Sequence, residues 1–264
     1  MSYSLNVLAA WVAGAARSLA APVTMAAAVL AAPAHAGEVR MFASNAVKEV
    51  LLELQPAFEK ESGHQLKVKW GGTPDIVKSV EQREGFDLVV IPSQAVDALE
   101  KRGLLRQGAR RDFVGSSIGA AVAPGAEPVD VSSKEAFKQA VVSARSVVLS
   151  SGPSSVYLLE LFEKLGISEE VKPKLKRLPP GASVGEALAA REGELGFTQV
   201  SELKHMKGIR FLGPIGADIQ RVTVFSFGWT SADPDARSAA SDLVRFLRGP
   251  AVAHAVQEAG LEPK

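Results

Sequence analysis

The 264-residue chain contains no cysteine, so disulfide bonds, thiol chemistry and cysteine-based metal sites are excluded. Its four histidines (positions 35, 64, 205 and 254) are scattered, without the i, i+3 or i+4 spacing of a metal-binding pair. No G-x-G-x-x-G or G-x-x-x-x-G-K-[ST] motif follows a predicted strand, which leaves nucleotide binding without support. The run 115–119 fits G-x-S-x-G, but it leads into a strand where a hydrolase needs a helix. We therefore expect no cofactor and no metal.

The chain also lacks an excess of either charge, with 30 Lys and Arg against 29 Asp and Glu. Residues 1–36 contain Arg17 as their single charged residue, so the remainder carries 29 residues of each sign. A protein without a basic surplus is not steered toward nucleic acid, and no such partner is expected.

The N-terminal region differs from the rest of the chain. An alanine-rich apolar stretch runs over residues 19–32 and ends in Ala34-His35-Ala36, the A-x-A pattern of a secretory signal peptide cleaved after Ala36. A membrane anchor is the alternative, but the alanine content, Pro22 and Pro33 make a weak spanning helix. No second segment approaches 18 apolar residues, so we expect a periplasmic protein that is released from the membrane.

Apolar periodicity predicts an alternation of strands and helices from residue 38 onward. The predicted strands are 38–42, 65–70, 87–91, 118–122, 146–150, 195–198, 210–212 and 221–227. Glycines are predicted to end the helices that follow several strands, at Gly63, Gly85, Gly103, Gly166 and Gly193. Helices over 234–247 and 250–259 close the chain.

This alternation predicts an α/β fold of two lobes, each a mostly parallel sheet flanked by helices, with a ligand cleft between the lobes. After the signal peptide at 1–36, lobe 1 is expected at 37–119 and 225–264, and lobe 2 at 120–224.

The most informative stretch is 146–166, a strand followed by a turn of small residues and a helix. The helix begins with Ser151-Gly152-Pro153-Ser154-Ser155, which offers free backbone N–H groups, hydroxyls and the positive end of a helix dipole. Such a terminus suits a small anion, although serine is also a common helix cap.

Similar turns follow other predicted strands. They are Ser44/Asn45, Gly72/Thr73 (with Thr73 as helix cap), Ser93 and Gln199/Ser201 (with Ser201 as helix cap). None of these turns contains Lys or Arg, so hydroxyls, amides and helix N-termini would hold the anion. Ligands bind beyond the carboxyl ends of strands in open parallel sheets. The predicted ligand-binding residues are Ser44, Asn45, Gly72, Thr73, Ser93, Ser151, Gly152, Ser154, Ser155, Tyr157 and Gln199.

Four stretches carry a family resemblance: VRMFASNAVKEVL, GFDLVVIPSQAVDALEKRGLL, SVVLSSGPSSVYL and GELGFTQVSELKHMKGI. Across nearly the whole chain after residue 36, the sequence resembles the periplasmic solute-binding proteins of ABC transporters, nearest to their molybdate-binding class. The resemblance implies a monomer that binds a small anion (an oxyanion or a di- or tricarboxylate), with an ABC-transporter membrane component as partner. The turn Trp70-Gly71-Gly72-Thr73 stands where molybdate binders tend to have serines, which favours a carboxylate-bearing ligand.

The stretches SVVLSSGPSSVYL and LGFTQVSELK also resemble a branch of this fold that includes periplasmic aconitate isomerase. An isomerase would need an acid-base residue near the ligand, and the candidates are Tyr157, Asp75, His64 and His205. A tricarboxylate would also favour a nearby arginine. Arg110 and Arg111 are the nearest to a predicted lobe crossing, where a solvated basic loop is the simpler interpretation. The sequence leaves binding protein and isomerase open.

Overall fold

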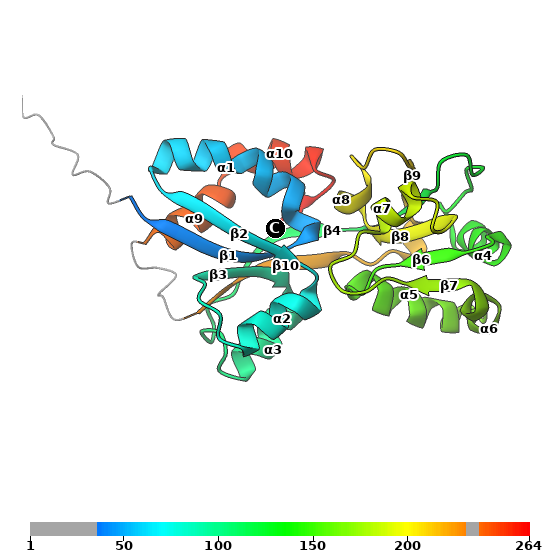
Figure 1. Ribbon diagram of the computed structural model, residues 1–264, viewed down its shortest axis with the longest axis horizontal. Coiled ribbons are helices and arrows are strands. Elements are labelled where there is room, and N and C mark those ends of the chain that lie inside the picture. The colour runs from blue at the N-terminus through cyan, green and yellow to red at the C-terminus, as the bar shows by residue number, and fades with distance from the viewer. Residues whose placement is uncertain (1–35, 231–237) are drawn as a thin grey trace, which may run out of the picture. The chain divides into compact units, whose positions relative to one another are not determined.

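The computed structural model describes residues 36–230 and 238–264, shown as ribbons in Figure 1. The predicted signal peptide, apart from Ala36 at its cleavage site, lies outside the described residues, as does the start of the helix predicted at 234–247. Among residues 36–230 and 238–264, no helix has both the length and the apolar character needed to cross a membrane.

The first sheet contains the strands from both ends of the described chain. Its strand order is β11-β4-β10-β3-β1-β2. The strands β1, β2 and β3 run parallel to one another, whereas β10 is antiparallel to β3 and β4, and β11 is antiparallel to β4. The bounds are β1 (Glu38–Ser44), β2 (Gln65–Gly71), β3 (Leu88–Pro92), β4 (Arg111–Ser116), β10 (Thr223–Trp229) and β11 (Glu262–Pro263).

Helices cover both faces of this sheet, because side chains of a strand point alternately to the two sides. In β1, Val39 and Met41 belong to a core with α1 (Lys48–Ser62), α9 (Ala239–Leu247) and α10 (Ala253–Glu258). Phe42 belongs to the opposite core, with α2 (Thr73–Glu81) and α3 (Ser93–Lys101). Burying both faces of a strand fixes its register, since a slip by one residue would exchange the two cores.

The second sheet has the order β7-β6-β8-β5-β9. Its strands are β5 (Ile118–Val122), β6 (Val147–Leu149), β7 (Leu175–Arg177), β8 (Leu195–Gln199) and β9 (Arg210–Pro214). The helices α4 (Lys134–Ser143), α5 (Pro153–Lys164) and α6 (Ser168–Val171) pack on one face. The helices α7 (Val184–Ala189) and α8 (Val200–Leu203) pack on the other. Short 3₁₀ turns complete the chain: η1 (Asn45–Val47), η2 (Lys172–Lys174), η3 (Ala217–Ile219) and η4 (Pro250–Val252).

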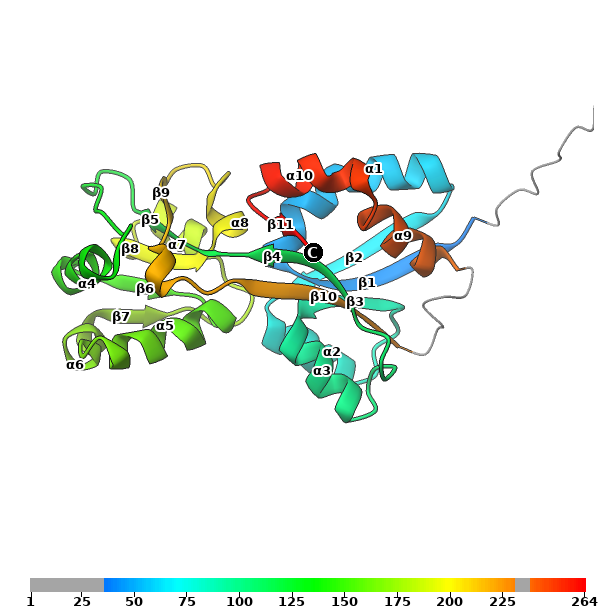
Figure 2. The same cartoon turned by 180° about the vertical axis from the view of Figure 1, so that it is seen from behind.

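Two segments connect the sheets and lie side by side in both views (Figures 1 and 2). Ser117 alone separates β4 from β5, and the chain returns from β9 through η3 to β10. The Gln220 side chain joins the two segments: its Oε1 accepts the Ile118 N–H at 2.7 Å, and its Nε2 donates to the Ile118 carbonyl at 3.0 Å. The connection is therefore a short paired ribbon.

The predicted α/β architecture of two sheets flanked by helices is confirmed, and each sheet is mixed because β5, β9 and β10 run against their neighbours. The strands β4, β7 and β11 were not predicted from the sequence. The expectation that Gly193 ends a helix is wrong: α7 ends at Ala189, and Arg191 follows with φ 58°. The lobe limits 37–119 with 225–264, and 120–224, remain predictions.

Candidate functional site

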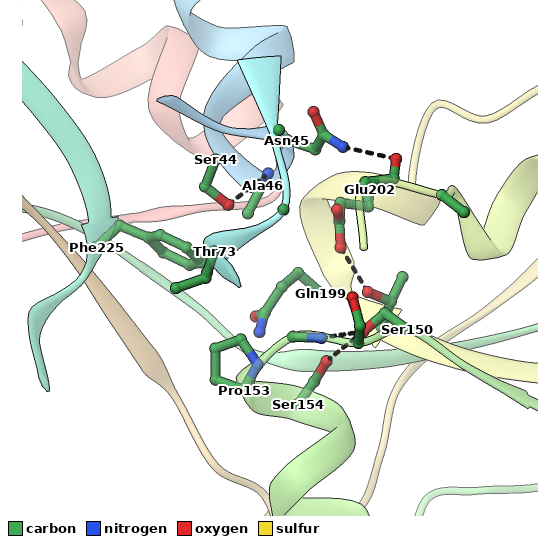
Figure 3. A pocket seen from close by; sticks show the side chains of 17 residues that line it. Ser44, Asn45, Ala46, Thr73, Ser150, Pro153, Ser154, Gln199, Glu202 and Phe225 are labelled. Atoms are coloured by element: carbon green, nitrogen blue, oxygen red, sulfur yellow. Dashed lines mark hydrogen bonds between the residues drawn. The ribbon is translucent and has the colours of Figure 1, made fainter. Parts of the chain in front are cut away.

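A small cavity of about 40 Å³ is lined by residues from both sheets (Figure 3). The first sheet contributes the turns after β1 and β2, and the second contributes the turns after β6, β7 and β8. The lining residues are Ser44, Asn45, Ala46, Gly71, Gly72, Thr73, Ser150, Ser151, Gly152, Pro153, Ser154, Gly181, Ala182, Thr198, Gln199, Glu202 and Phe225. This lining contains neither Lys nor Arg, and Glu202 is its one ionisable residue.

On the side of the first sheet, the chain leaves two parallel strands through short polar turns. Ser44 is buried and caps η1, its Oγ accepting the N–H of Ala46 at 3.3 Å. Gly72 is the N-cap of α2, and its side-chain-free backbone leaves the helix N-terminus open toward the cavity. Pro74 has no N–H, and the Asp75 N–H donates to the Gly72 carbonyl at 3.0 Å. Thr73 therefore has the N–H group without a helical acceptor at this terminus, where the helix dipole is positive.

The rim of the cavity is narrow where the two sheets approach. Asn45 donates a hydrogen bond from Nδ2 to the carbonyl of Gly181 at 3.3 Å. A Cβ placed on Gly72 would lie 2.8 Å from the backbone nitrogen of Gly181, which is closer than non-bonded atoms pack. These two turns, at Gly72 and at Gly181, form the rims of the cavity. A larger residue at position 72 would therefore force the two rims apart.

On the side of the second sheet, the helix predicted to bind an anion points its N-terminus at the cavity. Gly152 is the N-cap of α5 and Pro153 occupies its first turn. The Ser150 Oγ accepts the Gly152 N–H at 3.3 Å and lies 3.4 Å from the Ser154 Oγ, which orients both hydroxyls. Together with α2, this gives the cavity two helix N-termini from different sheets.

Gln199 brings an unsatisfied polar group into the site. Its side chain points into the space between Thr73 and Pro153 (Figure 3) and is only 3% exposed. The Nε2 donates to the Thr223 hydroxyl at 3.1 Å, while the Oε1 has no hydrogen-bond partner. A half-turn of the amide would let Oε1 accept from Thr223 and would offer Nε2 to a ligand. A buried polar atom without a partner indicates a site built to meet one.

Glu202 lies three residues after Gln199 and is half-buried in the cavity wall. Its Oε2 accepts a hydrogen bond from the Thr198 hydroxyl at 2.5 Å. Burial raises the pKa of the Glu202 carboxyl, and the hydrogen bonds from the Thr198 hydroxyl and the Gln199 backbone oppose this only in part. The carboxyl group of Glu202 therefore stays protonated to a higher pH than that of an exposed glutamate.

The predicted ligand-binding residues line this cavity, with the exception of Ser93, Ser155 and Tyr157. Ser93 begins α3, which packs against β10 and on the same face of the first sheet as α2, but Ser93 does not line the cavity. Ser155 is fully buried and its Oγ has no hydrogen-bond partner. The Tyr157 hydroxyl donates to the Ile219 carbonyl at 2.7 Å. Ligand binding by the residues that do line the cavity remains a prediction.

The helix caps also differ from the predicted ones. Gly72 and Gln199, rather than Thr73 and Ser201, hold the N-cap positions of α2 and α8. Ser201 lies inside α8, with its Oγ 3.4 Å from the Ser116 Oγ.

The acid-base candidates named from the sequence lie outside the cavity lining. Asp75 is exposed on the first turn of α2, near the rim. His64 is buried between the Gly37 N–H, which donates to its Nδ1 at 3.0 Å, and Asp242, 3.3 Å from its Nε2. His205 is exposed, with its Nε2 2.6 Å from the Glu258 carbonyl oxygen.

The two arginines are also remote from the cavity lining. Arg110 forms ion pairs with Asp97 at 2.7 Å and Asp112 at 3.3 Å. Arg111 begins β4, and its Nη1 donates to the Ala109 carbonyl at 3.1 Å. Neither lines the cavity.

Sequence reasoning missed Glu202 and Gly181 in particular. Glu202 lies in the first turn of α8, directly after Gln199, which the sequence already marked, so its acidic side chain could have been included. Gly181 follows β7, an edge strand of the three residues Leu-Lys-Arg, which is too short to give an apolar pattern. Within the described parts of the chain, no group of three or more His, Cys, Asp or Glu residues could hold a metal ion.

The fold and this site define a two-sheet protein with a polar cavity between its sheets. The family model described as bacterial extracellular solute-binding protein matches residues 39–262, so the chain belongs to this family. The chain is 32% identical over 229 residues to an aconitate isomerase from Pseudomonas sp, covering 84% of this chain and 87% of the relative. It is 27% identical over 191 residues to a molybdate-binding protein from Azotobacter vinelandii, covering 69% of this chain and 72% of the relative.

The fold is that of solved solute-binding proteins as well. The structure of an Azotobacter vinelandii periplasmic molybdate-binding protein superposes with a TM-score of 0.70 at 15% identity. That alignment covers 86% of this chain and 99% of the other.

Proposed function

We propose that this protein binds a small organic anion, a di- or tricarboxylate, in the cavity between its two sheets. The observation that carries the proposal is the convergence of the N-termini of α2 and α5 on one cavity that contains hydroxyls and amides but no Lys or Arg. Dipoles and neutral donors can hold a negative charge without a counter-ion. The unpartnered amide end of Gln199 supplies a further group for the ligand.

Carbon-containing ligands suit this lining better than a bare oxyanion. Phe225 and Pro153 give the cavity an apolar side, and a tetrahedral oxyanion has no carbon atoms to pack against it. A second cavity of about 310 Å³ adjoins the first and shares Asn45, Gly181 and Glu202 with it. An extended carboxylic acid could therefore place one carboxylate at the helix N-termini and reach outward with another.

The family and the N-terminal sequence support export. We propose a periplasmic, monomeric protein whose signal peptide is removed after Ala36 and whose partner is an ABC-transporter membrane component. The paired segments β4–β5 and β9–β10 would act as the hinge on which the two sheets close over the ligand. N-terminal sequencing of the protein purified from the periplasm tests the cleavage site, with Gly37 expected as the first residue.

Isomerisation of an unsaturated tricarboxylate is the second candidate function. Moving a double bond requires a group that removes a proton next to a carboxylate and returns it elsewhere. Glu202 is a specific observation in favour, because it is an ionisable side chain in the cavity wall, and the relative at 32% identity is an aconitate isomerase. Both functions use the same cavity.

A thermal-shift panel tests anion binding. The purified protein is heated with molybdate, tungstate, sulfate, phosphate, citrate, cis-aconitate or trans-aconitate. An anion at 100 times its dissociation constant should stabilise the fold by about 2.7 kcal/mol. Thr73→Val, which removes a cavity hydroxyl, should weaken this effect, whereas Ser93→Ala, outside the cavity, should leave it unchanged. Stabilisation by the inorganic oxyanions alone would refute the carboxylate preference.

Incubation with cis-aconitate separates the two candidates. Formation of trans-aconitate, followed by proton NMR and abolished by Glu202→Gln, would establish the isomerase. Binding without conversion would leave the protein as a carboxylate-binding protein.

A further inference from the structure

Glu202 stands between two cavities. It belongs to the lining of the inner cavity of about 40 Å³ and to that of the outer cavity of about 310 Å³. The outer cavity is lined by Asn45, Lys48, Glu49, Gly181, Ser183, Glu186, Ser201, Glu202, His205 and Met206. The carboxyl group is thus placed where it can meet a ligand on one side and exchange a proton with the outer cavity on the other.

A negative charge on Glu202 would oppose the binding of an anion in the inner cavity. The lining offers helix N-termini, hydroxyls and amides that favour a negative guest, and it has no cation to compensate a second negative charge. Two like charges in one site raise each other's affinity for protons. A bound anion and an ionised Glu202 would therefore repel each other, and a proton on Glu202 removes the conflict.

We propose that anion binding is linked to protonation of Glu202, so that the protein takes up one proton with its ligand and loses affinity as the pH rises. The inference rests on the proposed function and assigns Glu202 as the residue that makes this site sensitive to pH. The proton stays on the carboxyl, where it allows Glu202 to donate a hydrogen bond to the anion in place of repelling it. No bond of the ligand changes in this step.

The geometry around Glu202 supports this role. The Thr198 hydroxyl already donates to Oε2 at 2.5 Å, so the carboxyl group is held in place at the cavity wall. Burial raises the pKa of Glu202 before any ligand enters, which brings its titration closer to neutral pH.

Other titratable groups face Glu202 across the outer cavity, and each can influence it. Helix α1 contributes Lys48 and Glu49, α7 contributes Glu186, and His205 follows α8. The two carboxylates favour the protonated form of Glu202, whereas Lys48 opposes it. His205 is an ionisable side chain in the lining of the same outer cavity, so its contribution to a pH profile is tested separately by substitution.

The test measures dissociation constants by isothermal titration calorimetry from pH 7 to pH 9, with trans-aconitate and molybdate as separate probes. We expect the affinity of the wild type to fall by up to tenfold per pH unit above the pKa of Glu202. Titrations in two buffers of different ionisation enthalpy should report uptake of up to one proton per anion. Glu202→Gln keeps an acceptor oxygen for Thr198, and it should bind with a flat pH profile and without proton uptake.

His205→Gln and Glu186→Gln serve as matched controls in the outer cavity and should keep the slope of the wild type. Circular dichroism and urea unfolding establish that each variant folds. Binding by the wild type with a flat profile, or an unchanged slope in Glu202→Gln, would overturn the proton linkage and leave the proposed function standing. A slope lost in His205→Gln would assign the linkage to the histidine and overturn the inference. If neither probe binds at any pH, the proposed function fails and this inference fails with it.

Discussion

The replacement Gly72→Ala tests whether ligand binding uses the close approach of the two rims. The backbone of Gly72 has φ −71° and ψ 156°, which alanine adopts freely, so the substitution introduces no backbone strain. Its new methyl group would lie 2.8 Å from the Gly181 nitrogen. Because non-bonded heavy atoms need about 3.5 Å, the rims must separate by roughly 0.7 Å.

The cost of this overpacking sets the expected loss of affinity. Inserting a methyl group into a closed contact costs about 1–3 kcal/mol, which corresponds to a dissociation constant about 5- to 150-fold higher. The free protein can relieve the contact by opening. It also gains up to about 1 kcal/mol, since alanine reduces the conformational entropy of the unfolded chain. The variant should therefore bind trans-aconitate more weakly while its own unfolding free energy is unchanged or slightly raised.

Titration calorimetry measures the affinity, and urea unfolding of the free protein measures its stability. Gly71→Ala is the matched control, because its methyl group would meet Asp75 and Ile76 at 3.6 Å, an ordinary contact. Wild-type affinity in Gly72→Ala would refute the reasoning that these rims stay in contact around a bound ligand. Equal losses in both variants would assign the effect to the added volume in the turn.

Three further substitutions probe buried polar groups, all by urea unfolding. Ser155→Ala removes a buried hydroxyl that has no partner and should raise the unfolding free energy by about 1 kcal/mol; a decrease would show an unrecognised hydrogen bond. His64→Ala removes the bonds to Gly37 and Asp242 and leaves a hole, so it should cost about 2–4 kcal/mol without changing anion affinity. The pKa of Glu202 is raised on folding, so the stability of the wild type should fall as the pH rises through that pKa. Glu202→Gln should remove this slope, and its advantage over the wild type at pH 8 should disappear near pH 4, where both side chains are neutral; a slope that persists would contradict the assignment.

Much of the site could be predicted from the sequence because it follows strand ends. A strand that ends in small polar residues predicts an open turn after it. The turns at Ser44, Thr73, Ser151 and Gln199 follow this rule, and all four residues line the cavity. Helices α2 and α5 follow β2 and β6, which lie in different sheets, and the N-termini of both helices line the same cavity.

Whether a predicted site residue lies in the cavity lining depends on contacts that the local sequence pattern does not contain. Ser93 has the same local signal as Thr73, and α3 packs on the same face of the sheet as α2. However, Ser93 follows β3, which β1 separates from β2, and it does not line the cavity. Helical spacing placed Tyr157 one turn into α5 without fixing its direction, and its hydroxyl bonds to Ile219. Strand order and side-chain direction are tertiary properties, so the sequence pattern does not indicate that Ser93 and Tyr157 lie outside the cavity lining.

In the proposed proton linkage, the charge balance of the inner cavity makes anion affinity depend on pH more than on salt. A site built on arginines carries a permanent positive charge, which an acidic neighbour only reduces. Here the donors are neutral, so the formal charge of the lining changes from zero to minus one when Glu202 ionises. Dipoles of buried groups act at short range, where dissolved ions screen little. A single carboxyl group can therefore decide whether this cavity attracts or repels an anion, which gives Glu202 more influence here than the same residue would have beside a lysine.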